Sequence, residues 1–183
     1  MQKDKGHSRR KFLKTSATLA AMGFLGTQTF VNAKDAKMQK TQEVVKAGSL
    51  GGFKGDSKIF SGEVNVKMLF KSGDYRNFSG AEVTFSPKAR TAWHTHPAGQ
   101  TLIVTQGTIY TGTKQGITQI AKVGDVVLCP SDVEHWHGAG LKEKGVHIAL
   151  THEKDGKNVT WLELLSDTEY EGYIKEAKNK AKK

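Results

Sequence analysis

The chain has 183 residues, a formal net charge of +10 and a single cysteine, Cys129, which excludes an intrachain disulfide. The lysines are scattered and gather at the tail in "KEAKNKAKK", which is typical of a solvated surface. A nucleic-acid-binding protein would show a basic stripe interleaved with aromatic residues, and the sequence has none, so we expect no nucleic-acid partner.

The first 33 residues have the features of an export signal. The segment "HSRRKFLK" carries Arg9 and Arg10, a short apolar stretch covers residues 17–25, and Ala33 ends a small-residue exit. This order resembles a twin-arginine signal, which the export machinery reads as an address. The apolar stretch is too short and too broken to span a bilayer. We therefore expect a periplasmic protein without membrane contact after processing; a basic arm or an interfacial helix is the alternative.

The remaining 150 residues suit one domain with one core. Residues 34–60 are polar and then Gly-rich, which indicates an irregular N-terminal arm. A domain at 61–166 and a tail at 167–183 follow, and Ser166 or Asp167 could cap a short helix in that tail.

Short segments with period-two alternation fill the domain. Each is rich in Val, Ile, Thr and aromatic residues, and most are bounded by Gly, Pro, Ser or Asp, which is the pattern of a strand. The predicted strands are 63–70, 81–86, 101–107, 107–113, 117–123, 125–130, 146–152 and 159–165. About eight short strands predict an all-β sandwich or barrel.

Five of the seven histidines lie between positions 94 and 147. In "AWHTHPAGQTLIV", His94 and His96 are two apart and therefore point to the same face of a strand, and Gln100 has the same parity. His135, in "EHWHGAG", could supply a third imidazole from another strand. Three imidazole nitrogens and an amide oxygen can coordinate a divalent transition metal and leave two of six positions open.

A lone histidine on a strand is more often a satisfied polar residue than a ligand. Four or five histidines on separate segments of a small domain are harder to explain by packing, because burying so many imidazoles without partners would cost several kcal/mol. The clustering therefore favours a metal site.

Two longer motifs resemble the cupin family. "HTHPAGQTLIVTQG" is similar to the first cupin motif and "GDVVLCPSDVEH" to the second, over a region of about 64–165. Four positions depart from the family: Gln100 stands for Glu, Lys88 and Asp132 stand for Gly, and Ala139 stands for Asn. The two replaced glycines put the turns there in question, since Gly tolerates positive φ. The resemblance implies a jelly-roll barrel.

A narrower resemblance is to the small single-domain cupins that include manganese-dependent hydroxynitrile lyases and stand near carboxymuconolactone decarboxylase-like proteins. That subgroup has Gln in the metal shell, as here. The resemblance implies that His94, His96, Gln100 and His135 hold the metal and that His137 and His147 line the pocket. It implies Mn as the metal. The imidazole ligands also suit Fe, Zn or Ni, which are the next expectations.

We expect lyase-like chemistry on a small organic substrate, with a metal-polarised oxygen and His137 moving the proton. The alternative role for His137 is to hold a metal ligand in its orientation. An Fe or Mn dioxygenase and a non-catalytic periplasmic metal or ligand binder are the competing functions. A homo-oligomer, a dimer or a tetramer, is expected because small barrels leave an exposed sheet edge.

Overall fold

The computed structural model describes residues 41–182, so the predicted export signal and the start of the arm lie outside the described residues. The described chain forms a 12-stranded antiparallel sheet and one helix. The elements are β1 (Gly52–Lys54), β2 (Phe60–Ser61), β3 (Val64–Phe70), β4 (Phe78–Phe85), β5 (Arg90–Thr91), β6 (His94–Thr95), β7 (Gln100–Thr113), β8 (Thr118–Lys122), β9 (Val126–Cys129), β10 (His135–Ala139), β11 (Gly145–His152), β12 (Thr160–Trp161) and α1 (Asp167–Lys180). The predicted all-β class with a C-terminal helix is confirmed.

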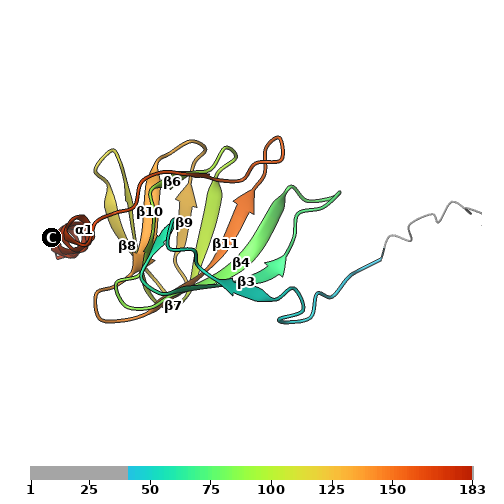
Figure 1. The fold of residues 1–183 in the computed structure, drawn as a ribbon, viewed down its shortest axis with the longest axis horizontal. Helices are drawn as coiled ribbons and strands as arrows, with labels where there is room; N and C mark the ends of the chain where they lie inside the picture. The colour runs from blue at the N-terminus through green and yellow to red at the C-terminus, as the bar shows by residue number, and fades with distance from the viewer. Residues whose placement is uncertain (1–40, 183) are drawn as a thin grey trace, which may run out of the picture. The chain divides into compact units, whose positions relative to one another are not determined.

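The sheet curls into a half-barrel because β7 belongs to both of its sides. The first half of β7 pairs with β9 and β11, and the second half pairs with β8 and β10. Gly107 lies at the changeover with a φ of 65°, and a Cβ there would collide with the carbonyl oxygen of Lys144. Figure 1 shows the strands following one another around the curl, from β3 and β4 to β10 and β8.

Most predicted strands are present, and the structure adds β5, β6 and β10, which are not among the eight predicted segments. The predicted strands 101–107 and 107–113 form one strand, because Gly107 bends β7 without ending it. Only Thr160 and Trp161 of the predicted strand 159–165 pair in the sheet. The described part of the predicted arm contains β1, which pairs with β3, and the first residue of β2, which pairs with β5.

The inner side of the curl holds the larger hydrophobic core. Side chains that alternate along the strands meet there, as expected for strands with one buried face. Its fully buried members include Val64, Phe85, Leu102, Val104 and Ile109. The histidine cluster described below packs against this core.

A second core lies on the outer side, under helix α1. Ser166 begins the helix with a capping box, in which its side chain and that of Glu169 each accept from the other residue's backbone N–H. Tyr170, Ile174 and Ala177 recur at helical spacing and are buried against the sheet. Among the described residues, no helix has the length and apolar composition needed to cross a bilayer.

The two turns that lack the family's glycines keep the backbone that glycine would favour. Lys88 has a φ of 67° and Asp132 a φ of 61°. Asp is among the residues that tolerate this left-handed region, whereas Lys is unusual there. The replacements therefore leave both turns left-handed, and the strands that follow are not displaced from their pairing.

Candidate metal centre

The pairing of β6 with β10 brings distant histidines together. His135 lies directly opposite His94 in the register of these strands, and their ring centroids are 4.1 Å apart. His96, which follows β6, has its ring 5.0 Å from that of His94 and 5.4 Å from that of His135. All three side chains are buried. Three imidazoles predicted from the sequence to converge therefore lie against one another.

Each of these three rings is fixed by its Nδ1 atom. A backbone carbonyl can only accept, so an Nδ1 atom beside it carries the proton and donates. The acceptors are the carbonyl oxygens of Ala92 for His94 (3.0 Å), Asn158 for His96, and Val133 for His135 (2.9 Å). This tautomer leaves the Nε2 lone pair free, which is the form that binds a metal.

Several of the inward lone pairs have no partner within the described part of the chain. The Nε2 atoms of His96 and His135 and the Oε1 atom of Gln100 are buried and make no hydrogen bond there. At the other end of the Gln100 amide, Nε2 donates to Thr151 Oγ1 at 3.0 Å. Buried lone pairs without donors are costly. Two nitrogens and one oxygen of this kind beside His94 fit a divalent transition metal.

His137 and His147 form a pair beside this group. His137 shares the face of His135 on β10, and its ring lies 5.2 Å from that of His94. Its Nδ1 atom is 3.1 Å from Nε2 of His147, which is on β11 and completely buried. The backbone N–H of His137 donates to Thr91 Oγ1 at 3.1 Å. The five histidines thus make one continuous cluster across three strands.

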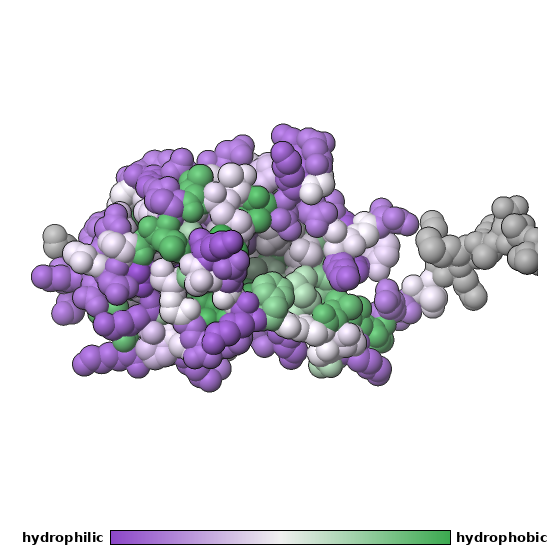
Figure 2. Space-filling view, viewed as in Figure 1, coloured by the Kyte–Doolittle hydropathy of each residue, from purple (hydrophilic) through white to green (hydrophobic). Residues whose placement is uncertain are grey.

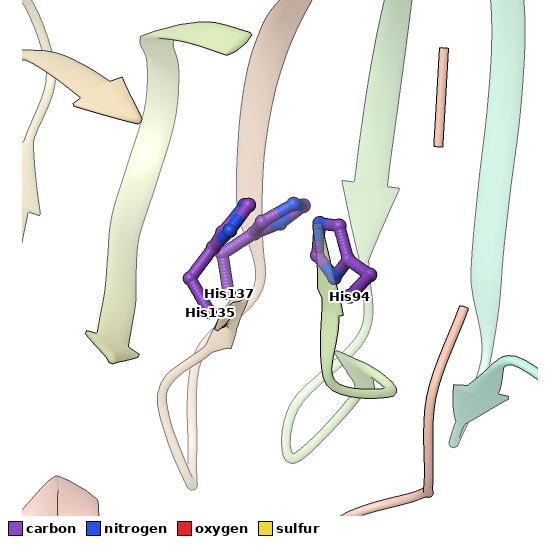
Figure 3. Close-up of side chains that lie close together, drawn as sticks. All are labelled: His94, His135 and His137. Carbon is purple, nitrogen blue, oxygen red and sulfur yellow. The ribbon is translucent and has the colours of Figure 1, made fainter. Parts of the chain in front are cut away.

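A second group of potential ligand atoms includes His137. One nitrogen each from His94, His135 and His137 lies within 4.8 Å of the others. Figure 3 shows these three side chains pointing toward one another from β6 and β10. Two overlapping sets of ligands therefore share His94 and His135. One adds His96 and Gln100, as predicted from the sequence, and the other adds His137.

Burial keeps the whole cluster neutral. Loss of solvent lowers the pKa of His94 and His137 well below the ordinary value, with neighbouring imidazoles lowering it further. Burial lowers the pKa of His96, lowers that of His135 to about 4 and lowers that of His147 to about 3. Neutral imidazoles are the metal-binding form. The cluster is therefore able to bind a cation at neutral pH without first losing protons.

A cavity of about 280 Å³ opens onto the cluster. Its polar wall consists of Thr91, His94, Gln100, His137 and His147. Its other walls are apolar and are made by Phe53, Ile59, Phe60, Val66, Val83, Ala149 and Trp161. Figure 2 shows hydrophobic side chains bordering a hollow on one face of the molecule. The cavity can hold a small molecule with an apolar body and a polar group directed at the histidines.

Comparisons with known proteins agree with this architecture. The family profile described as "Cupin domain" matches residues 81–148. An (R)-mandelonitrile lyase of Granulicella tundricola is 42% identical over 128 residues, covering 70% of this chain and 98% of that protein. The chain belongs to the cupin family.

Solved structures extend this result. A cupin-like protein from Thermotoga maritima has 38% identity and a TM-score of 0.63 over 72% of this chain and 97% of its own. A cupin 2 conserved barrel domain protein from Rhodopseudomonas palustris has 10% identity and a TM-score of 0.53 over 72% of this chain and 88% of its own. The second likeness shows that the fold persists where the sequence does not.

Four other residues near the motifs of this cupin lie away from the cavity. Trp93 and Trp136 belong to the outer core, because their parity is opposite to that of His94 and His135. Arg90 points neither to the pocket nor to solvent: its buried guanidinium donates to the carbonyl of Leu165 at 2.6 Å. Cys129 is buried, and burial raises the pKa of its thiol to about 11, which makes a reactive thiolate unfavourable.

Sequence reasoning missed several residues of the cupin's site. Thr151 contacts Gln100, and Phe53, Phe60 and Trp161 line the cavity. Phe53 is 56% exposed although it forms part of the cavity wall, so it lies at the entrance. No local signal marks these positions, because cross-strand register and the path of the N-terminal segment decide them.

Proposed function

We propose that this cupin is a metal-dependent lyase that acts on a small organic hydroxy or carbonyl compound. The observation that carries the proposal is the set of buried lone pairs of His96, His135 and Gln100, which have no partner within the described residues. The rings of His96 and His135 lie against that of His94, and His94 and Gln100 line the largely apolar cavity. The relative named as an (R)-mandelonitrile lyase makes cyanohydrin cleavage the first activity to test.

His94, His96, Gln100 and His135 would hold the ion, with Mn as the first expectation and Fe, Zn or Ni next. An ion in this position supplies a Lewis acid that stabilises negative charge on a substrate oxygen. Gln100 is neutral, unlike the Glu common in the family, so the ligand set leaves the positive charge of the ion undiminished.

His137 would carry the proton. If its Nδ1–H donates to His147 Nε2, 3.1 Å away, its own Nε2 is free to accept the hydroxyl proton of a cyanohydrin. The bond to the cyano carbon then breaks, its electron pair leaves on cyanide, and the carbonyl forms. Cyanide takes the proton back from His137. His147 orients the ring and stabilises its charged form through the same hydrogen bond.

The apolar walls would hold the organic part of the substrate. Phe60 and Trp161 meet edge to face, with ring centroids 5.6 Å apart, and the Trp161 ring lies 4.9 Å from that of His94. A substrate packed against these rings excludes water from the histidines and places its oxygen beside them.

The test is aldehyde release from mandelonitrile by the metal-loaded protein, followed by ultraviolet absorbance. His137→Ala should keep the ion and lose turnover, and His152→Ala, outside the cluster, should keep both. If His137→Ala loses the ion instead, His137 is a ligand and not the proton carrier. Oxygen uptake with a catechol or flavonol would favour a dioxygenase. Ion binding without turnover of any substrate in a broad panel would favour a binding protein.

We also propose that the protein is exported after folding and loading in the cytoplasm, on the evidence of Arg9 and Arg10. Loading there would let Mn or Fe enter ahead of the tighter-binding Cu and Zn. Metal analysis of natively exported protein that finds only Zn or Cu would contradict this. The exposed edge strand β1 is a candidate for pairing between copies, which light scattering of the processed protein would test.

A further inference from the structure

Gln100 and Thr151 face each other across two paired strands. They are direct partners in the register of β7 and β11, although 51 residues separate them along the chain. Gln100 is only 8% exposed, and its Nε2 atom donates to Thr151 Oγ1 at 3.0 Å. Its Oε1 atom is buried and makes no hydrogen bond within the described residues, and Gln100 lines the cavity together with His94, His137 and His147. The two ends of one amide therefore have different surroundings.

The two ends of an amide are not equivalent toward a cation. The oxygen can bind an ion, whereas the NH₂ group is only a donor. A half-turn about the last side-chain bond exchanges them and would present NH₂ to the imidazole lone pairs, which are good acceptors when the rings are neutral. The orientation that binds an ion turns NH₂ away from the histidines. It is favoured only if NH₂ finds an acceptor there, because a buried donor without one is costly.

Thr151 Oγ1 is that acceptor. We propose that Thr151 is a positioning residue that holds the amide of Gln100 with its oxygen toward the histidines, and so favours ions that take oxygen ligands over ions satisfied by nitrogen alone. The inference rests on the metal-binding part of the proposed function. The nitrogen atoms of His94, His135 and His137 form an alternative ligand set without oxygen, so an ion could bind here without Gln100.

The test measures ion affinity and does not depend on turnover. Thr151→Val keeps the shape and β-branching of the side chain and removes the hydroxyl. Affinities for Mn²⁺ and Zn²⁺, measured by competition with a chelating indicator, should fall unequally. We expect a loss of roughly 10-fold to 100-fold for Mn²⁺, the range for changes to groups that support a metal ligand, and a smaller loss for Zn²⁺. The Mn²⁺ electron paramagnetic resonance spectrum should change as the oxygen ligand is lost.

Two controls separate positioning from a general structural effect. Thr151→Ser restores the acceptor and should restore the Mn²⁺ to Zn²⁺ ratio. Thr101→Val changes a partly exposed threonine next to Gln100 on β7, where the side chain has opposite parity, and should leave the ratio unchanged. Gln100→Glu gives a side chain whose two ends are both oxygens. In that background Thr151→Val should no longer alter the ratio.

Each outcome decides the proposal. Equal losses for both ions, unchanged affinities, or failure of serine to restore the ratio would overturn it. If Thr151→Val does not fold, the Mn²⁺ to Zn²⁺ affinity ratios of Thr151→Ser and Gln100→Glu are each compared with that of the unmodified protein. An altered ratio in Thr151→Ser then overturns the proposal. If the unmodified protein binds no ion, the proposed function and this inference fail together. Ion binding without any turnover defeats only the lyase, since the affinity ratio still tests Thr151.

Discussion

The two faces of strands β6 and β10 are both buried, but they carry different kinds of side chain. Neighbouring residues alternate between them: Trp93 faces the outer core and His94 the cavity, and Trp136 lies between the inward His135 and His137. On the outer face, Trp136 packs against Tyr170 with ring centroids 5.1 Å apart. On the inner face, imidazoles pack against imidazoles.

The kind of unpartnered atom distinguishes the faces. On the outer face, the described residues leave two N–H donors unpartnered, Nε of Arg90 and Nε1 of Trp136. On the inner face, they leave lone pairs on His96, His135 and Gln100, together with the Nδ1 atom of His147. A donor surrounded by aromatic packing cannot bind a cation, whereas a convergent set of lone pairs can. Local departures from complete hydrogen bonding are expected at functional sites, and here only the inner face has the right chemistry.

The largest effect should come from removing an inner ligand. His135→Ala takes away a nitrogen that belongs to both possible ligand sets, so ion binding should be abolished. The loss should exceed the roughly 10-fold to 100-fold caused by changing a supporting group. Metal analysis after gel filtration measures it. Retention of a full equivalent of tightly bound ion would show that the site does not use His135.

Removing an outer aromatic should have the opposite consequence. Trp136→Ala empties a fully buried position between the sheet and α1 and should lower the free energy of unfolding by about 3–5 kcal/mol. Denaturant titration of the metal-free protein measures this. The folded fraction should still bind one ion. A variant that kept its stability and lost its ion would show that the two faces are not separable.

Acid should destabilise the metal-free protein through the inner face. The unfolded chain takes up protons at its histidines below about pH 6.5, whereas burial holds the folded pKa of His135 at about 4 and that of His147 at about 3. Protons therefore favour the unfolded chain, and the stability present above pH 6.5 is lost as the pH falls toward those values.

Between pH 6 and pH 5 these two histidines should together remove roughly 2 kcal/mol, at about 1.4 kcal/mol per pH unit for each ring. Denaturant unfolding across that range measures the slope. His147→Gln removes one of the two rings and should reduce the slope by about half of this amount. A slope that stays the same in His147→Gln would show that His147 is not kept neutral.

The faces were predictable from sequence because side-chain parity is a local property. Period-two alternation places His94 and His96 on one side and Trp93 on the other without knowledge of which strands pair. The spacing of the two cupin-like motifs predicted which histidines would meet. A helix cap at Ser166 or Asp167 was predicted for the same reason, because capping depends on residues close together in the chain, and the structure has it at Ser166.

Side-chain contacts that depend on strand register could not be predicted from the sequence. The contact between Gln100 and Thr151 requires the alignment of β7 with β11, and no local pattern encodes it. Arg90 is another example. Its ion pair with Asp167, at 2.8 Å, depends on how α1 returns to the sheet, so the sequence left the direction of this side chain open. The continuous β7 was hidden because glycine inside a strand looks like a turn.

The smallest expected effect comes from the N-cap of α1, and it tests whether the stability of the outer face influences ion binding on the inner face. Ser166→Ala removes the N-cap of α1, where the Ser166 hydroxyl accepts from the backbone N–H of Glu169 at 3.2 Å. The free energy of unfolding should fall by about 1 kcal/mol, and Ser166→Asp, which can also cap a helix, should recover most of it. Thermal unfolding of both variants measures the change. Ion affinity should stay the same in both, because the buried side chains of α1 belong to the outer core and none of its residues lines the cavity. A matching loss of affinity in Ser166→Ala would mean that the helix sets the positions of the histidines through the tryptophans between them, and the division of β6 and β10 into a stabilising face and a binding face would have to be abandoned.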